Sequence, residues 1–238
     1  MYKGERIVLI IPAYNEEGKI GNVVRKAKRW SGFLDDVVVI NDGSSDRTEE
    51  EARNMGATVI NHNKNRGVGA ALRTGFNYAM KRKYDIIVVA AGDDQDDPSK
   101  IKDLIDPIVN EGYDFVQGSR YLGGYKPNLP KFRYITTKSF SLIFSIIAGK
   151  KITDATNGFR AFRTYLLKKI DLNKEWMNRY ELEPYFMLEV IKRGFKMKEV
   201  GVPKYWPEGK SYSKMIPFKS WWSISKPMIY SLLHIKRN

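Results

Sequence analysis

Four aspartates and one glutamine stand close together in residues 92–98, directly after an apolar run. Carboxylate and carboxamide oxygens are the ligands that Mg²⁺ and Mn²⁺ prefer, and such an ion neutralises a bound diphosphate. We take Asp93 and Gln95 as the candidate metal ligands. For Asp96 and Asp97, a structural role as caps of the next helix is at least as well supported.

Two other short segments have the composition of nucleotide-binding loops. Residues 12–16 (Pro-Ala-Tyr-Asn-Glu) follow one apolar run, and residues 41–45 (Asn-Asp-Gly-Ser-Ser) follow the next. An aromatic ring, carboxylate acceptors and the N-terminus of a following helix can hold a base, a ribose and phosphates. Each segment alone is also a common turn, and Ser44 or Ser45 is expected to cap the helix that follows.

Short β-branched runs alternate with longer segments of helical periodicity, which predicts an α/β fold. Runs that are apolar on both faces are typical of a parallel sheet covered by helices, so we expect a Rossmann-like, mainly parallel sheet with helices on both faces. Ligands of such sheets bind at the carboxyl ends of the strands, where the polar loops lie. The expected strands are residues 7–12, 37–40, 58–60, 85–91, 115–117 and 196–200.

The 238-residue chain carries 41 Lys and Arg against 27 Asp and Glu, a formal net charge of +14. This charge favours an anionic partner: nucleic acid, acidic lipid or a phosphorylated substrate. The absence of cysteine excludes disulfides, thiolate catalysis and cysteine-ligated metals from this chain, and it agrees with a reducing compartment. Since the first residues lack the features of a secretory signal, we expect a cytoplasmic protein.

The C-terminal part of the chain contains two candidate lipid contacts. The apolar run 140–148 has lysines and an arginine around it, and it is far shorter than the roughly 20 residues that span a bilayer. Residues 212–238 mix tryptophans with lysines, which is typical of an interfacial helix. We expect a catalytic domain over 1–211 and a basic, amphipathic helical segment over 212–238 at a membrane surface. Packing of both segments on the sheet is the alternative.

Taken together, the loops resemble the family 2 glycosyltransferases, especially the dolichyl-phosphate mannose synthase-like branch. The resemblance covers nearly the whole chain and implies the GT-A fold. It implies inverting transfer of a hexose from a GDP- or UDP-linked nucleotide sugar to a polyprenyl or dolichyl phosphate, at the inner face of the membrane. A separate membrane subunit is a further partner that it leaves open. The matching segments are residues 8–17, 38–48, 65–71, 92–98, 118–120 and 154–160.

The resemblance also implies which residues bind the donor and the metal. Asp93 and Gln95 resemble the metal-binding pair, for Mg²⁺ or Mn²⁺. Ala91 stands where the mannose synthases carry an aspartate, so one metal ligand is missing and the diphosphate and water would hold more of the ion. For the basic residue of the C-terminal Ser-Lys motif, Lys210-Ser211 competes with Lys214. The implied donor-binding residues are Pro12, Ala13, Tyr14, Glu16, Ile40, Asp42, Arg66, Gly92 and Lys214.

On the acceptor side, Arg120 and Arg133 resemble the basic residues that receive the acceptor phosphate. A phosphate is anionic at neutral pH, so it needs a cationic cradle and no strong general base. If the acceptor is a sugar hydroxyl, Asp154 is the candidate base; in the structural interpretation, it caps the turn into Thr156. These two interpretations of Asp154 stay open.

Three other functions remain as alternatives. The first is transfer to a saccharide hydroxyl in polysaccharide or glycoprotein glycan assembly. A basic nucleic-acid-binding protein is the second, but no recognition motif with stacking aromatics supports it, so we expect no nucleic-acid partner. A sugar nucleotidyltransferase would carry a glycine-rich, basic triphosphate loop, which residues 13–18 do not provide. Neither His62 nor His234 has a partner cluster in the sequence, so both are poor metal candidates.

Overall fold

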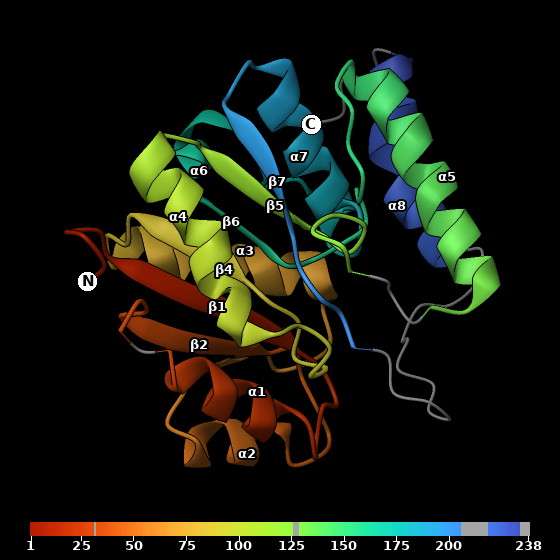
Figure 1. Cartoon of the computed structure of the whole chain (residues 1–238). Coiled ribbons are helices and arrows are strands. Elements are labelled where there is room, and N and C mark those ends of the chain that lie inside the picture. The colour runs from red at the N-terminus through yellow and green to blue at the C-terminus, as the bar shows by residue number, and fades with distance from the viewer. Residues whose placement is uncertain (31, 126–128, 206–218, 234–238) are drawn as a thin grey trace.

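The computed structural model describes residues 1–30, 32–125, 129–205 and 219–233. Within these ranges, seven strands form one sheet in the order β3-β2-β1-β4-β6-β5-β7 (Figure 1). Strand β6 is antiparallel to β4 and β5, and the other neighbours are parallel, which confirms the mainly parallel α/β sheet. The strands are β1 (Ile7–Ala13), β2 (Asp36–Asn41), β3 (Thr58–Asn61), β4 (Ile86–Val89), β5 (Phe115–Ser119), β6 (Arg160–Arg163) and β7 (Met197–Gly201).

Helices on both faces of the sheet enclose two apolar layers. Side chains of β1 alternate between them: Val8 and Ile10 lie in one layer with residues of α3 and α7, and Ile7 and Leu9 lie in the other with residues of α1 and α4. Each such buried side chain stabilises the fold by about 1.5–3 kcal/mol. The helices are α1 (Ile20–Lys28), α2 (Thr48–Asn54), α3 (Val68–Lys81), α4 (Ile101–Glu111), α5 (Lys131–Ala148), α6 (Leu166–Lys169), α7 (Leu182–Lys192) and α8 (Lys219–Leu232), with 3₁₀ turns η1 (Pro98–Lys100) and η2 (Glu175–Met177).

Strand β6 was not expected from the sequence. Its four residues are Arg-Ala-Phe-Arg, which show no apolar run. Ala161 and Phe162 are nevertheless fully buried, because β6 pairs with β4 on one side and β5 on the other. This pairing places Arg160 opposite both Val89 and Gln117. Arg160 therefore stands at the edge of the sheet where β4 and β5 end.

The start of α2 also differs from expectation, because neither Ser44 nor Ser45 caps it. The hydroxyl of Ser44 accepts a hydrogen bond from the backbone N–H of Asn15 at 2.9 Å. Asp46 instead accepts from the backbone N–H of Thr48, the first helical residue, at 3.0 Å. The serines therefore join the two loops to each other. Asp46, one residue later, accepts the hydrogen bond at the start of the helix.

Helices α5 and α8 lie side by side at one end of the molecule (Figure 1). Helix α5 buries Phe140 and Phe144 and exposes Leu142 and Ile146. Helix α8 is the described part of the expected 212–238 segment, and its Ser223 hydroxyl accepts from the backbone N–H of Tyr180 at 3.2 Å. Within the described ranges, no helix combines the length and the apolar character needed to cross a bilayer.

Candidate active site

Three loops meet at the carboxyl edge of the sheet, because β2, β1 and β4 are neighbouring parallel strands. The loops after β1 and β2 are tied together by hydrogen bonds. Asp42 donates its backbone N–H to the carbonyl of Ala13 at 2.8 Å, and Ser45 donates to the side chain of Asn15 at 2.9 Å. The loop after β4 packs against the first: a Cβ on Gly92 would lie 3.3 Å from the Cβ of Ala13 and 3.3 Å from the carbonyl oxygen of Pro12.

Within this edge, the residues expected to bind the donor differ in exposure. Tyr14 is exposed at the rim, whereas Glu16 is buried and its carboxylate pairs with Lys19 at 3.0 Å. Ile40 is fully buried within β2 and supports the loop from the core. The side chain of Arg66 is exposed. Lys214 lies outside the described residues.

The carboxylate of Asp42 is held by three donors inside the protein. His62 Nδ1 lies 2.6 Å from Asp42 Oδ1, and the backbone N–H groups of Arg66 and Gly67 donate at 2.9 and 2.8 Å. On its other side, His62 Nε2 lies 2.8 Å from the hydroxyl of Thr74 in α3. His62 is therefore part of the site as a support of Asp42, a role that its isolated position in the sequence did not indicate.

The aspartates of the acidic loop after β4 have different partners. Asp94 pairs with Lys26 of α1 at 2.8 Å, and Asp96 pairs with Lys204 at 2.9 Å. Asp97 accepts from the backbone N–H of Ser99 at 2.9 Å, which confirms its role as the cap of η1. A capping role for Asp96 is wrong, because its two oxygens hold Lys204 and the backbone N–H of Ala91.

Asp93 and Gln95 have the surroundings of a cation site. Burial raises the pKa of Asp93, the charge of Lys204 opposes this shift, and the carboxylates of Asp96 and Glu16 add to it. Gln95 Nε2 is buried and has no hydrogen-bond partner among the described residues, which leaves a donor for an oxygen of a bound ligand, while its Oε1 is the atom that could bind a cation. Across those same residues, no three acidic, histidine or cysteine side chains form a metal cluster by themselves. The site therefore fits a divalent cation held by Asp93, Gln95 and oxygens from outside the protein.

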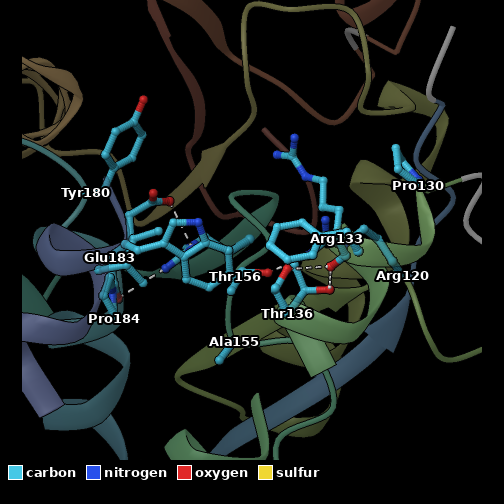
Figure 2. Close-up of a pocket in the computed structure, with 14 residues that line it drawn as sticks. Arg120, Pro130, Arg133, Thr136, Ala155, Thr156, Tyr180, Glu183 and Pro184 are labelled. Atoms are coloured by element: carbon cyan, nitrogen blue, oxygen red, sulfur yellow. Dashed lines mark hydrogen bonds and ion pairs between the residues drawn. The ribbon is translucent and has the colours of Figure 1, made fainter. Parts of the chain in front are cut away.

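Three arginines line a cavity of about 420 Å³: Arg120, Arg133 and Arg160. In Figure 2, Arg120 and Arg133 stand on one side and Tyr180 and Glu183 on the other. The rest of the wall is mainly apolar or hydroxylic. The remaining lining residues are Pro130, Phe132, Thr136, Thr137, Ala155, Thr156, Pro184, Trp221 and Ile224.

Arg120 and Asp154 form a two-point ion pair at the base of this cavity. Arg120 Nε lies 2.6 Å from Asp154 Oδ2, and Arg120 Nη2 lies 2.7 Å from Oδ1. Burial alone would raise the pKa of Asp154, but the charge and hydrogen bonds of Arg120 lower it below its ordinary value. Asp154 also accepts from the backbone N–H of Thr156 at 3.3 Å, so it caps this turn. A carboxylate in this state is a poor general base.

Arg133 connects the cavity to the acidic loop electrostatically. Burial and the charge of Arg120 lower the pKa of Arg133, while the carboxylate of Asp93 acts in the opposite direction. Arg133 stands in the first turn of α5, so the helix itself positions the guanidinium. The charge of the expected metal ligand Asp93 thus acts on one of the expected acceptor arginines.

A second, apolar groove of about 370 Å³ runs between α5 and α8. It shares Thr136 and Trp221 with the arginine cavity, so the two lie next to each other. Its other lining residues are Ile135, Ser139, Phe140, Ile143, Ile147, Ser225, Met228, Ile229 and Leu232. A ligand with a phosphate head and a long apolar chain matches an arginine-lined cavity next to an apolar groove.

A family model described as "Glycosyl transferase family 2" matches residues 8–171, which is more than half of the 238-residue chain. The chain belongs to glycosyl transferase family 2. The matched range contains the three loops, Arg120, Arg133 and Asp154, and it ends before α7 and α8. Family membership makes the protein a glycosyltransferase.

Two relatives in this family align over most of the chain. A UDP-N-acetylglucosamine–dolichyl-phosphate N-acetylglucosaminyltransferase of Methanococcus voltae is 30% identical over 251 residues, covering 97% of this chain and 96% of that protein. A polyprenol monophosphomannose synthase of Mycolicibacterium smegmatis is 30% identical over 205 residues, covering 83% of this chain and 77% of that protein.

Among solved structures, glucosyl-3-phosphoglycerate synthase of Mycobacterium tuberculosis, in complex with Mn²⁺, UDP and phosphoglyceric acid, matches with a TM-score of 0.74. The two proteins are 20% identical, and the match covers 97% of this chain and 78% of that one. At this identity the likeness concerns the fold alone, and it confirms the expected GT-A fold of this family 2 enzyme.

Four residues of the candidate site were not predicted from the sequence as site residues. They are His62, Arg160, Glu183 and Lys204. Arg160 pairs with Glu183 at 3.0 Å, and both line the arginine cavity. The segment 154–160 had pointed to this region, but only the antiparallel placement of β6 turns Arg160 toward it. For Lys204 the sequence held no signal, because its partner Asp96 lies 108 residues earlier.

Proposed function

We propose that this family 2 glycosyltransferase moves a hexose from a GDP- or UDP-linked nucleotide sugar to a polyprenyl phosphate, with inversion at the anomeric carbon. The observation that carries the proposal is that three surfaces lie next to one another. The charge of Asp93 acts on Arg133 in the arginine cavity, and this cavity shares Thr136 and Trp221 with the apolar groove between α5 and α8. A donor diphosphate, an acceptor phosphate and a prenyl chain need these surfaces in this order.

The donor lies on the loops after β1, β2 and β4. Tyr14 offers an exposed ring for the base or ribose, and Glu16 offers a buried carboxylate that pairs with Lys19 and whose charge acts on Asp93. Asp42 stands beneath them, oriented by His62. The names of the two relatives point to different sugars, N-acetylglucosamine from UDP in one and mannose in the other, so both nucleotides belong in the test.

The acceptor phosphate lies between Arg120 and Arg133. Its oxygen attacks the anomeric carbon while the bond to the donor diphosphate breaks, and the electron pair leaves with the nucleoside diphosphate. Because the phosphate is already ionised, no proton has to be removed. This chemistry suits a site in which Asp154 is committed to Arg120 by hydrogen bonds of 2.6 and 2.7 Å.

A divalent cation bound by Asp93 and Gln95 would supply charge neutralisation for the departing diphosphate. On the protein side, the charge of Asp93 is coupled to Glu16 of the donor loops and to Arg133 of the cavity. Gln95 is fixed by its backbone carbonyl, which accepts from Tyr205 N–H at 3.0 Å. The expected Mg²⁺ or Mn²⁺ dependence is therefore part of the proposal.

In this proposal, the outer face of α5 and α8 contacts the cytoplasmic face of the membrane that carries the acceptor. Exposed apolar side chains gather there, with Lys150 and Lys151 at the end of α5 to contact anionic lipid. A separate membrane subunit is the alternative occupant of this face. The exposed apolar residues are Phe132, Ile135, Leu142, Ile143 and Ile146 of α5 and Trp222 and Leu232 of α8, followed by Leu233.

Transfer to a saccharide hydroxyl is the second candidate, and Glu183 is the observation in its favour. This carboxylate lines the arginine cavity and keeps a fifth of its side-chain surface exposed, at 21%. A hydroxyl acceptor needs a general base, and Glu183 is more exposed than the fully buried Asp154, although it pairs with Arg160 at 3.0 Å. In this case Glu183→Gln abolishes transfer to the saccharide. With a phosphate acceptor, the substitution removes only the counter-charge of Arg160, and the folded variant keeps its transfer activity.

The test is a competition assay with radiolabelled GDP- and UDP-sugars, in which polyprenyl phosphate and an oligosaccharide are offered together with Mg²⁺ or Mn²⁺. The proposal expects label in the lipid-phosphate product, and the product of an α-linked donor must be β-linked. Label in the oligosaccharide, lost in Glu183→Gln, would establish the second candidate instead.

A further inference from the structure

Residues 202–205, which follow β7, are held against the acidic loop and the end of β5 by backbone hydrogen bonds. Tyr205 donates its N–H to the carbonyl of Gln95 at 3.0 Å, and Lys204 forms an isolated antiparallel bridge with Asp96. Val202, two residues earlier, donates to the carbonyl of Ser119 at 2.9 Å at the end of β5. These backbone hydrogen bonds on both sides of Lys204 fix its position relative to the loop.

The ammonium group of Lys204 lies 2.9 Å from Asp96 Oδ1, and the two side chains are only 10% and 3% exposed. The other oxygen of Asp96 accepts from the backbone N–H of Ala91 at 3.0 Å. Both ends of the Asp96 carboxylate are therefore fixed. Because water is largely excluded, the charges of this pair act more strongly on their neighbours than surface charges do.

This pair decides how much negative charge the loop presents to a cation. Asp94 is matched by Lys26, and Asp96 is matched by Lys204. Asp93 has no ion pair among the described residues, and Lys204 and Asp96 act on it with opposite sign. Asp97 is taken up by the cap of η1, so with Lys204 in place Asp93 is the loop carboxylate that neither an ion pair nor a cap occupies among the described residues. Without Lys204, the buried carboxylate of Asp96 is also left without its counter-charge.

We propose that Lys204 is a built-in counter-ion of the metal site, which keeps the affinity of the free enzyme for divalent cations low and makes metal binding depend on the donor diphosphate. The affinity of oxygen sites for hard cations rises with the number of charged ligands. A site with one carboxylate and one amide is weak until the diphosphate adds its own anionic oxygens. The inference rests on the proposed function in one respect, that a nucleotide diphosphate is the co-ligand.

The experiment measures Mn²⁺ binding by electron paramagnetic resonance to the full chain, first without and then with UDP or GDP. For Lys204→Met we expect Mn²⁺ to bind the nucleotide-free protein at least about tenfold more tightly than the wild type, because Asp96 is released. Lys204→Arg keeps the charge and should match the wild type. Lys26→Met is the matched control, since it removes the lysine of the neighbouring pair with Asp94.

Adding Asp96→Asn to Lys204→Met should return the affinity to the wild-type level, because the freed carboxylate is then gone. By itself, Asp96→Asn should weaken Mn²⁺ binding in the nucleotide complex, since it leaves the ammonium group of Lys204 uncompensated beside Asp93. This single variant also covers the case in which Lys204→Met does not fold, as judged by circular dichroism.

The proposal is overturned if folded Lys204→Met binds Mn²⁺ no more tightly than the wild type, or if Asp96→Asn leaves binding unchanged or tighter. Failure of the proposed function has a different signature. In that case no polyprenyl phosphate is glycosylated by any variant, while the order of Mn²⁺ affinities among the nucleotide-free variants still holds.

Discussion

Arg120 and Asp154 meet in a two-point ion pair, at 2.6 and 2.7 Å, in which the aspartate is fully buried. This pairing fixes the plane of the guanidinium, and Arg120 Nη2 also donates to the hydroxyl of Thr156 at 2.5 Å. Arg120 therefore lines the cavity as an oriented cation, and Asp154 is the residue that orients it.

Asp154→Asn should destabilise the protein by about 3–5 kcal/mol at neutral pH, because it leaves Arg120 buried without its counter-charge. The pKa of Asp154 is lowered in the folded state. The stability from the pair is therefore complete above the unfolded pKa of about 3.9 and is lost as the pH falls through the lower folded value. Urea unfolding from pH 7 to pH 3 should show the gap between variant and wild type closing below about pH 4. A gap that widened with acid would contradict the assignment.

Asp93→Asn should reduce transfer by roughly a hundredfold or more, because the site loses the one carboxylate that is left to a cation. Folding should be retained, as judged by thermal denaturation. Asp94→Asn is the matched control, because Asp94 is already paired with Lys26 on the same loop. Equal loss of activity in both variants would mean that the loop acts through its fold rather than through Asp93.

Arg133→Gln should raise KM for the acceptor phosphate by about 10- to 100-fold, the value of one charge-assisted hydrogen bond, and leave KM for the donor nearly unchanged. Steady-state kinetics with each substrate varied in turn measures this split. Lys131→Gln, two residues earlier on α5 and exposed, serves as the control. If Arg133→Gln acts mainly on the donor, the cavity is not the acceptor site.

Ile146→Glu places a charge in the exposed apolar face of α5. We expect it to lower transfer to long-chain polyprenyl phosphate in anionic vesicles several-fold, and to leave transfer to a short, water-soluble prenyl phosphate unchanged. Vesicle co-sedimentation should fall in parallel. Met55→Glu introduces the same charge at an exposed methionine beside α2 and should have no effect. Loss of activity toward both acceptors would point to disturbed packing of α5.

His62→Ala should raise KM for the donor several-fold and destabilise the protein by about 1–3 kcal/mol, because Asp42 loses the donor at 2.6 Å and keeps only backbone N–H groups. Thr74→Val removes the support behind His62 and should have a smaller effect on both quantities. Isothermal titration with UDP and GDP checks the donor side. Unchanged nucleotide affinity in a folded His62→Ala would remove His62 from the site.

Much of the donor side followed from the sequence, for a physical reason. Apart from Asp85, the runs at 7–12, 37–40 and 85–91 are apolar on both faces, which is typical of the buried strands of a parallel sheet. Once these strands are parallel neighbours, their carboxyl ends meet, and the polar residues that follow them share one edge. Local pattern and chain order were enough to bring Tyr14, Asp42 and Asp93 together.

The charge pairs of the candidate site were decided by tertiary packing. Asp154 lies 34 residues from Arg120, and Lys204 lies 108 residues from Asp96. No local periodicity encodes such pairs, because they depend on where β6 and β7 enter the sheet. The sequence by itself determined which loops carry the chemistry. Only the folded chain decided which of their charges are already neutralised and which remain for a ligand, since that depends on the buried partners each charge meets.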